Sequence, residues 1–251
     1  MIIDPWQPEA LIIIAAIFLL AGAVKGVVGL GLPTVSLALL TLVFGLKGAM
    51  VLMIVPSFTT NVWQGVSGGA CLALLRRFWL LLTLTCVSIW FGAKLLHVID
   101  TNLLSALLGA VTFGYALYGL LTPNIPDVTA KEGWLSPVVG MINGAITGVT
   151  GSSVMPGVPY FQSLHMPRDE MIQAMGILFS TSALALGIAM GAEGLLPLDL
   201  GAASLAGLVP AFVGMWGGLW VRRRISQAAF KRALFVSLLV LGAYITVRAV
   251  M

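Results

Sequence analysis

The chemistry of this chain is expected to depend on a lysine inside an apolar stretch. Lys25 lies between Leu11 and Leu32, in a segment whose other residues are Ile, Leu, Ala, Val, Phe and Gly. A charge within a membrane span is costly unless it is paired or hydrated, so such a residue indicates function. The segment contains no Asp or Glu, which points to an anion from outside the protein as the partner. The alternative is a lysine that snorkels to the lipid headgroups.

Small and hydroxyl-bearing residues are predicted to complete an anion site around this lysine. Glycine lets the backbone approach a ligand closely, and hydroxyl, amide and backbone N–H groups donate the hydrogen bonds that an oxyanion accepts. The alternatives are tight helix packing for the glycines and hydrogen bonding between helices for the polar side chains. The predicted substrate-binding residues are Lys25, Gly29, Gly31, Asn61, Asn143, Thr147, Thr150, Gly151, Ser152 and Ser153.

The composition places these residues in a membrane protein. The chain of 251 residues is 59% hydrophobic and 9% charged, and its mean hydropathy is +1.06, whereas soluble domains carry about 25% charged residues. Basic residues cluster at the ends of apolar segments, as in cytoplasmic loops, so the net charge of +4 does not indicate nucleic-acid binding. Cys71 and Cys86 are expected to pack as small residues. The N-terminus lacks a basic region, so the first span is expected to be retained rather than cleaved.

Two of the apolar segments are too short to cross a membrane alone, because a span needs about 20 apolar residues. They are 33–45 and 153–165, and each follows a glycine-rich break and carries proline near its start. Half-helices in transporters direct their N-termini at anions, and here they would begin at Leu32-Pro33 and at Ser152-Ser153. The other predicted segments are 10–31, 48–74, 78–98, 102–122, 136–150, 171–191, 197–220 and 228–249.

The order of these segments predicts an internal repeat, with one half at 1–125 and the other at 126–251. The spacing Gly22-x-x-x-Gly26 before the first break corresponds to Gly140-x-x-x-Gly144 before the second, so Lys25 corresponds to Asn143. Each half would be a broken-helix hairpin followed by three transmembrane helices. The predicted fold class is an all-α polytopic membrane protein of two inverted repeats, with about eight to ten membrane segments.

The positive-inside rule gives this fold an orientation. If each broken pair leaves the membrane on the side where it started, then Arg76-Arg77 and Arg222-Arg223-Arg224 are cytoplasmic and both termini are external. A competing arrangement has one crossing per broken segment and places Arg76-Arg77 outside. Length favours the hairpins, because a single helix over 10–45 would be about 54 Å long in a hydrocarbon core about 30 Å thick.

The residues around the two breaks resemble the sulfite exporter TauE/SafE family, also called the 4-toluene sulfonate uptake family. The resemblance covers nearly the whole chain, although members usually show a longer glycine run at the first break. It implies a multi-pass carrier in the bacterial inner (plasma) membrane for sulfite, sulfonates or related organosulfur anions. The motifs that carry the resemblance are Gly22-Ala23-Val24-Lys25-Gly26-Val27-Val28-Gly29-Leu30-Gly31 and Gly140-Met141-Ile142-Asn143-Gly144-Ala145-Ile146-Thr147-Gly148.

We therefore expect a secondary transporter of small sulfur-containing anions, with the substrate bound at the midplane between the two broken helices. An anion channel is the close alternative, and a non-transporting membrane subunit would leave Lys25 unexplained. An enzyme is not expected, because no acid lies mid-span and His97 and His165 lie near span ends. The expected partners are a small anionic substrate and membrane lipid, with no nucleic acid, cofactor or metal, and a homo-oligomer is compatible with the sequence.

Overall fold

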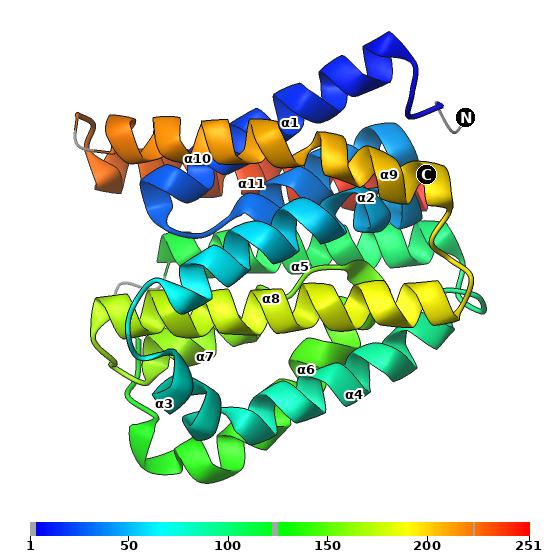
Figure 1. Ribbon diagram of the computed structural model, residues 1–251. Coiled ribbons are helices and arrows are strands. Elements are labelled where there is room, and N and C mark those ends of the chain that lie inside the picture. Colours follow the sequence, from blue (N-terminus) through cyan, green and yellow to red (C-terminus); the bar gives the residue numbers. More distant parts are fainter. Residues whose placement is uncertain (1–3, 122–124, 223) are drawn as a thin grey trace.

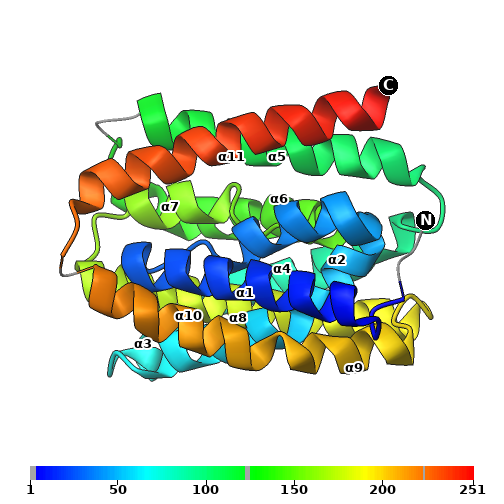
Figure 2. The same ribbon diagram turned by 90° about the horizontal axis from the view of Figure 1, so that it is seen from above.

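The chain forms a bundle of helices that lie side by side along a common direction (Figures 1 and 2). The computed structural model describes residues 4–121, 125–222 and 224–251, and within these ranges all regular structure is helical. Six of the helices are long and apolar enough to cross a membrane, and one bent helix pair provides a seventh candidate. The prediction of an all-α polytopic membrane protein is confirmed.

The predicted segments reappear as helices, with some boundaries moved. The bent pair is α3 and α4, whose axes differ by 70°, and Arg223 lies outside the described residues. The helices of the first half are α1 (Pro8–Val28), α2 (Leu32–Val66), α3 (Cys71–Arg77), α4 (Trp79–Leu95) and α5 (Thr101–Leu121). Those of the second half are the 3₁₀ helix η1 (Thr129–Lys131), α6 (Glu132–Thr150), α7 (Gly157–Ser163), α8 (Arg168–Ala192), α9 (Leu198–Ala206), α10 (Leu208–Val221) and α11 (Gln227–Val250).

The first break falls at the predicted glycines. Gly29 and Gly31 have φ angles of 90° and 109°, which side-chain-bearing residues rarely adopt, and α2 then begins at Leu32 with Pro33 in its first turn. Gly45, with φ 71° and ψ 169°, interrupts α2. The short predicted segment 33–45 is therefore confirmed as the first part of α2, and residues 10–45 do not form one straight helix.

The second break differs from its prediction. α6 is capped by Gly151, whose φ is 76°, but α7 begins at Gly157 and not at Ser152-Ser153. The hydroxyl of Thr147 lies 3.3 Å from the carbonyl oxygen of Ser152 and 3.0 Å from Ser153 Oγ. Side-chain hydrogen bonds of this kind compete with helix formation. The prediction of a half-helix N-terminus at Ser152-Ser153 is therefore wrong.

The hairpin of α6 and α7 returns to the end of the molecule from which it started. The backbone N–H of Val128, just before α6, donates to the carbonyl oxygen of Ser163 at the end of α7 at 3.0 Å. Thr129 Oγ1 also lies 3.1 Å from the carbonyl oxygen of Leu164. The chain thus reverses within this broken pair, as the hairpin arrangement requires.

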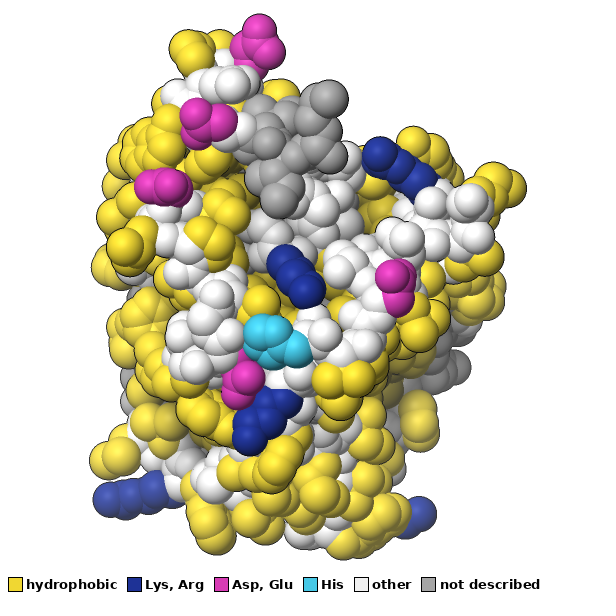
Figure 3. Space-filling view, turned by 90° about the vertical axis from the view of Figure 1, so that its right-hand side faces the viewer, with side chains coloured by type: hydrophobic (Ala, Val, Ile, Leu, Met, Phe, Trp, Pro, Cys, Tyr) yellow, Lys and Arg dark blue, Asp and Glu magenta, His cyan; other side chains and the backbone are white. Residues whose placement is uncertain are grey.

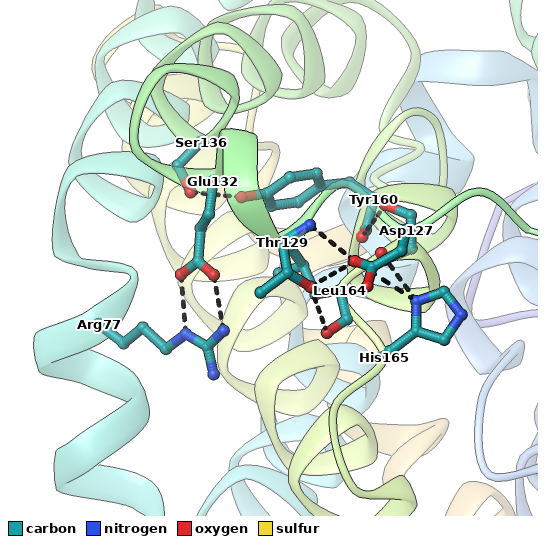
Figure 4. A network of polar contacts seen from close by, with 9 residues as sticks. Arg77, Asp127, Thr129, Glu132, Ser136, Tyr160, Leu164 and His165 are labelled. Carbon is teal, nitrogen blue, oxygen red and sulfur yellow. Dashed lines mark hydrogen bonds and ion pairs between the residues drawn. The ribbon is translucent and has the colours of Figure 1, made fainter.

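A polar network fastens this end of the hairpin to α3 (Figure 4). The guanidinium of Arg77 donates to both carboxylate oxygens of Glu132, at 2.7 and 2.6 Å, and such bidentate pairs fix orientation as well as charge. The hydroxyl and the backbone N–H of Thr129 donate to Asp127 Oδ1 at 2.6 and 2.8 Å. These two hydrogen bonds hold the pKa of Asp127 below its ordinary value, because they stabilise its charged form.

The two ends of the bundle carry different charges. One end, which we call the arginine-rich end, holds Arg76, Arg77, Arg168 and Arg222. The other, the terminal end, is where α1 begins and α11 finishes (Figure 1). Seen face on, the terminal end has acidic and basic side chains and a histidine among apolar ones (Figure 3). The charge difference is the one that the positive-inside rule predicts for a chain with both termini external.

Glycines bring several pairs of helices into backbone contact, among them α1 with α10 and α6 with α4. A Cβ atom added at Gly22 or Gly26 of α1 would lie 2.2 Å from a carbonyl oxygen of α10. One added at Gly140 or Gly144 of α6 would lie 2.5 or 2.3 Å from a carbonyl oxygen of α4. Gly148 meets α4 in the same way, so this glycine serves helix packing rather than approach to a ligand. Small residues allow such close packing in membranes.

The packing is shared between the two halves of the chain. α1 packs along α10 and α6 along α4, while α5 packs along α11 and α2 along α8. Exchanging each helix for its counterpart in the other half leaves this set of pairs unchanged. The division into repeats at 1–125 and 126–251 and the inverted two-fold relation between them stay predictions.

The glycine contacts generate a test of packing. Gly144→Ala should destabilise the protein by about 1–3 kcal/mol, because the new methyl group overlaps the carbonyl oxygen of Thr85. The matched control is Gly114→Ala in α5, where an added Cβ has nothing within 4 Å and the helix gains about 0.5–1 kcal/mol from lost backbone freedom in the unfolded chain. Thermal unfolding in detergent measures both, and equal melting temperatures would contradict the packing argument.

The charge distribution generates a test of orientation. In a chain with Cys71 and Cys86 replaced by serine, Asp199→Cys at the terminal end should react with a membrane-impermeant maleimide on intact cells. Lys131→Cys at the arginine-rich end should react only after permeabilisation, because basic loops stay in the cytoplasm. Both positions are exposed, so access to the reagent depends on the side of the membrane. The opposite labelling pattern would reverse the orientation.

Candidate functional site

The ammonium group of Lys25 lies inside the helix bundle. Lys25 belongs to the last turn of α1 and is only 3% exposed. Its Nζ donates to Thr60 Oγ1 at 3.2 Å and to Asn61 Oδ1, both in the second part of α2. Within the described residues no carboxylate pairs with it. The side chain therefore turns toward α2 and does not snorkel to the headgroups.

Pro56 shapes the part of α2 that receives this lysine. Proline has no N–H, so the carbonyl oxygen of Leu52 loses its helical donor, and the hydroxyl of Ser204 in α9 donates to it at 2.7 Å. One turn further on, the hydroxyl of Thr60 donates to the carbonyl oxygen of Pro56 at 2.7 Å. Because its hydrogen is used in this way, the Thr60 oxygen presents lone pairs to Lys25.

Lys25 lines a pocket of about 440 Å³, which we call the vestibule. Residues of α1, α2, α8 and α10 form its walls, and Asp169 and Arg222 line it at the arginine-rich end. Gln64 and Gln173 add polar groups to a wall that is otherwise largely apolar. The vestibule thus leads from the arginine-rich end of the molecule to a buried cation.

A second, much smaller cavity lies where the two breaks meet. Its volume is about 10 Å³, which holds about one water molecule. Pro33 from the first break and Gly151 from the second both line it, as do Ser57 of α2 and Ser182 of α8. The hydroxyl of Ser182 is buried and has no hydrogen-bond partner within the described residues. The two breaks therefore share one small polar cavity, as predicted for their positions in the repeat.

The order of residues along α2 and α8 places this cavity deeper than the vestibule. The vestibule touches α8 at Asp169 and Gln173, and the small cavity touches the same helix further on, from Phe179. A hydrogen-bonded chain connects the two spaces, because Lys25 donates to Asn61, whose Nδ2 donates to Ser57 Oγ at 3.2 Å. Polar groups thus continue from the open vestibule toward the terminal end.

Asn143, the predicted counterpart of Lys25, has a local role. It is fully buried, and its Oδ1 accepts a hydrogen bond from the backbone N–H of Gly157 at 3.2 Å, at the start of α7. Its Nδ2 has no partner within the described residues. Thr150 is likewise local, because its hydroxyl accepts from the N–H of Ser152 at 3.1 Å and so shapes the second break.

The predicted site residues thus fall into three groups. Lys25 and Gly29 line the vestibule, and Asn61 accepts a hydrogen bond from the Lys25 ammonium. The residues that line the small cavity are Thr147, Gly151 and Ser153. The residues that line neither of these two spaces and do not contact the Lys25 ammonium are Gly31, Asn143, Thr150 and Ser152.

Sequence reasoning missed Gln173, which joins α8 to the end of α2. Its Nε2 donates to the carbonyl oxygen of Gly65 at 2.7 Å, and its Oε1 accepts from the N–H of Ala70 at 3.1 Å. In the opposite direction, the side chain of Gln64 in α2 donates to the carbonyl oxygen of Ile172 in α8 at 2.7 Å. A glutamine in an apolar segment needs a partner, so its presence in 171–191 was the signal that could have found it.

The two histidines of the chain lie at the ends of the bundle. His97 Nε2 is 3.1 Å from the carbonyl oxygen of Glu193 at the terminal end, and His165 Nδ1 is 3.7 Å from Asp127 at the arginine-rich end. Within the described residues there is no group of three or more His, Cys, Asp or Glu side chains that could hold a metal ion. The chemistry available at Lys25 is therefore charge and hydrogen bonding.

Comparison with known proteins gives one match. The family model described as Sulfite exporter TauE/SafE matches residues 14–245, which is nearly the whole chain and includes both breaks and Lys25. No curated protein and no solved structure matches the chain significantly.

The environment of Lys25 generates a test of its structural role. Lys25→Met should leave the free energy of unfolding within about 1 kcal/mol of wild type or raise it, because a buried charge with neutral partners adds little stability. Thermal unfolding in detergent measures the change. The matched control is Lys94→Met, since Lys94 also lies in the last turn of a membrane helix but is exposed. A loss of several kcal/mol in Lys25→Met alone would make Lys25 a structural residue.

Proposed function

The chain belongs to the sulfite exporter TauE/SafE family, and from this premise we propose that it is a secondary carrier of small sulfur-containing anions, such as sulfite or a sulfonate, in the bacterial inner membrane. Its multi-pass helical architecture suits transport across a membrane. The observation that carries the proposal is the buried ammonium of Lys25, which has only neutral partners and ends an open vestibule.

An anion supplies what this arrangement lacks. A cation in a low-dielectric interior is stabilised strongly by a negative charge, and the hydroxyl and amide that hold Lys25 provide hydrogen bonds but no charge. A sulfite or sulfonate group has several acceptor oxygens, so it can take hydrogen bonds from the ammonium and from nearby amide groups together. The vestibule, at about 440 Å³, has room for such an anion and its remaining water.

The two spaces around Lys25 support a carrier rather than an open pore. The vestibule connects Lys25 to the arginine-rich end, whereas the cavity beyond it is about 10 Å³ and closed. With the arginine-rich end in the cytoplasm, this form faces inward. Transport then requires an alternative form in which the region around Ser57 and Ser182 opens toward the terminal end and the vestibule closes.

The same site does not favour an enzyme. Acid–base catalysis needs a titratable partner within hydrogen-bond reach of the reacting atoms. The partners of Lys25 are a threonine hydroxyl and an asparagine amide, and His97 and His165 lie at opposite ends of the bundle.

Transport in proteoliposomes tests the proposal. Purified wild-type protein should take up labelled sulfite, and unlabelled sulfonates or thiosulfate should compete better than carboxylates. Lys25→Ala should lower uptake at a fixed low substrate concentration by about tenfold or more, because it removes a charge-assisted hydrogen bond to the anion. Lys25→Arg should also be impaired, since a planar fork does not replace a compact ammonium. Lys94→Ala is the control and should transport normally.

One more variant tests whether anion uptake depends on the positive charge of Lys25 or only on the space around it. Asn61→Asp places a carboxylate where the amide oxygen now accepts from Lys25. This fixed anion should occupy the ammonium and block anion uptake while the protein stays folded in detergent. Uptake that survives in both Lys25→Ala and Asn61→Asp would overturn the assignment of Lys25 to the substrate.

A further inference from the structure

Another pocket borders the first break on a different side from the vestibule. It has a volume of about 150 Å³ and lies among α5, α7, α8 and α11, against Val27, Val28 and Leu30. Ile172 lines both this pocket and the vestibule, so it forms part of the wall between them. We call this space the α11 pocket.

Hydrogen-bond donors from four helices line the α11 pocket. They are Tyr115 of α5, Gln162 of α7, Arg168 of α8 and Lys231 of α11. No Asp or Glu lines the pocket, and neither of the two cations forms an ion pair within the described residues. The lining of the pocket therefore carries two cationic side chains and no carboxylate.

Tyr115 is the buried member of this set. It is 3% exposed and lines the pocket. The ring is held edge-on against Phe235, with centroids 5.4 Å apart. Lys231 Nζ lies 5.6 Å from the centre of the same Phe235 ring, an arrangement that attracts the cation to the ring face. Phe235 thus orders a phenol and an ammonium at one pocket before any ligand arrives.

We propose that the α11 pocket binds a phosphate group. A guanidinium, an ammonium, a phenol and an amide donate to the oxygens of a tetrahedral anion, and two cations suit its charge. The pocket lies at the arginine-rich end, where basic pockets between membrane helices bind anionic headgroups. An anionic phospholipid and free inorganic phosphate present the same oxygens, so both sources are tested.

Binding here would act on the element that carries the transport lysine. Val27 and Val28 form the last residues of α1, directly after Lys25 and Gly26, and they form one wall of the α11 pocket. A phosphate group held by Arg168 and Lys231 would tie α8 and α11 to this end of α1. The proposal does not depend on which substrate the vestibule takes.

Lipid binding tests the proposal directly. Wild-type protein, released from vesicles of phosphatidylcholine with added phosphatidylglycerol, is analysed by native mass spectrometry for retained phosphatidylglycerol. The double variant Arg168→Gln, Lys231→Gln should weaken retention about tenfold or more, because two charged donors are lost. Tyr115→Phe, which removes only the hydroxyl, should weaken it about fivefold. The control Arg76→Gln, Lys131→Gln removes the same charge at the same end, outside the pocket, and should change retention less than about twofold.

A second measurement identifies the source of the phosphate. The melting temperature of the wild-type protein is measured in lipid-free detergent with sodium phosphate and with sodium chloride of equal ionic strength. If the pocket binds the free ion, the melting temperature should be higher in phosphate. The double variant should lose this difference. Retention of phosphatidylglycerol without a phosphate shift assigns the pocket to lipid. The proposal is overturned if neither ligand depends on Arg168 and Lys231, or if the control variant loses as much as the pocket variant.

Discussion

The ammonium of Lys25 is held by a threonine hydroxyl and an asparagine amide within an apolar bundle. The need to stabilise this buried charge constrains the structure around it. Neutral oxygens satisfy its hydrogen bonds but leave its charge uncompensated. Such a group is tolerable only where water or an anion reaches it, and the vestibule provides that access. The hydroxyl of Thr60 donates to the carbonyl oxygen of Pro56, and Ser204 satisfies the carbonyl oxygen that Pro56 leaves without a donor. A binding group, its access route and its supporting helix thus depend on one another.

Close packing at glycines recurs between helices of the two halves of the chain. Close backbone contact at glycines joins α1 to α10 and α6 to α4, and each pair combines helices from both halves of the chain. α2 and α8 also meet at a glycine, because a Cβ atom added at Gly176 of α8 would lie 2.7 Å from the backbone nitrogen of Gly65 in α2. Near the same contact, Gln64 and Gln173 donate hydrogen bonds from their side chains to backbone carbonyl oxygens of the opposite helix. The contact between α2 and α8 at the vestibule thus combines close backbone approach with polar hydrogen bonds.

Much of this fold could be predicted from the sequence because glycine and proline act locally. Gly29 and Gly151 end α1 and α6 with positive φ angles, and Gly31 followed by Pro33 marks the start of α2. The start of α7 could not be predicted, since it depends on Thr147 holding the serines after Gly151 in an irregular chain. The site was predicted only in part. Lys25 was recognisable by its charge, whereas the capping role of Asn143 depends on the return of α7 beside α6.

The pairing of α1 with α10 has a consequence for biosynthesis. α1 is complete at Val28, but the helix that covers its glycine face is complete only at Val221. At usual rates of translation the ribosome needs about 10–40 s to make the intervening chain. During that time Gly22 and Gly26 face lipid or a temporary neighbour, because their final partner does not yet exist. Assembly of the bundle is thus a late event that joins the first inserted helix to one of the last, and a chain interrupted midway leaves an unfilled groove for the quality-control machinery of the membrane.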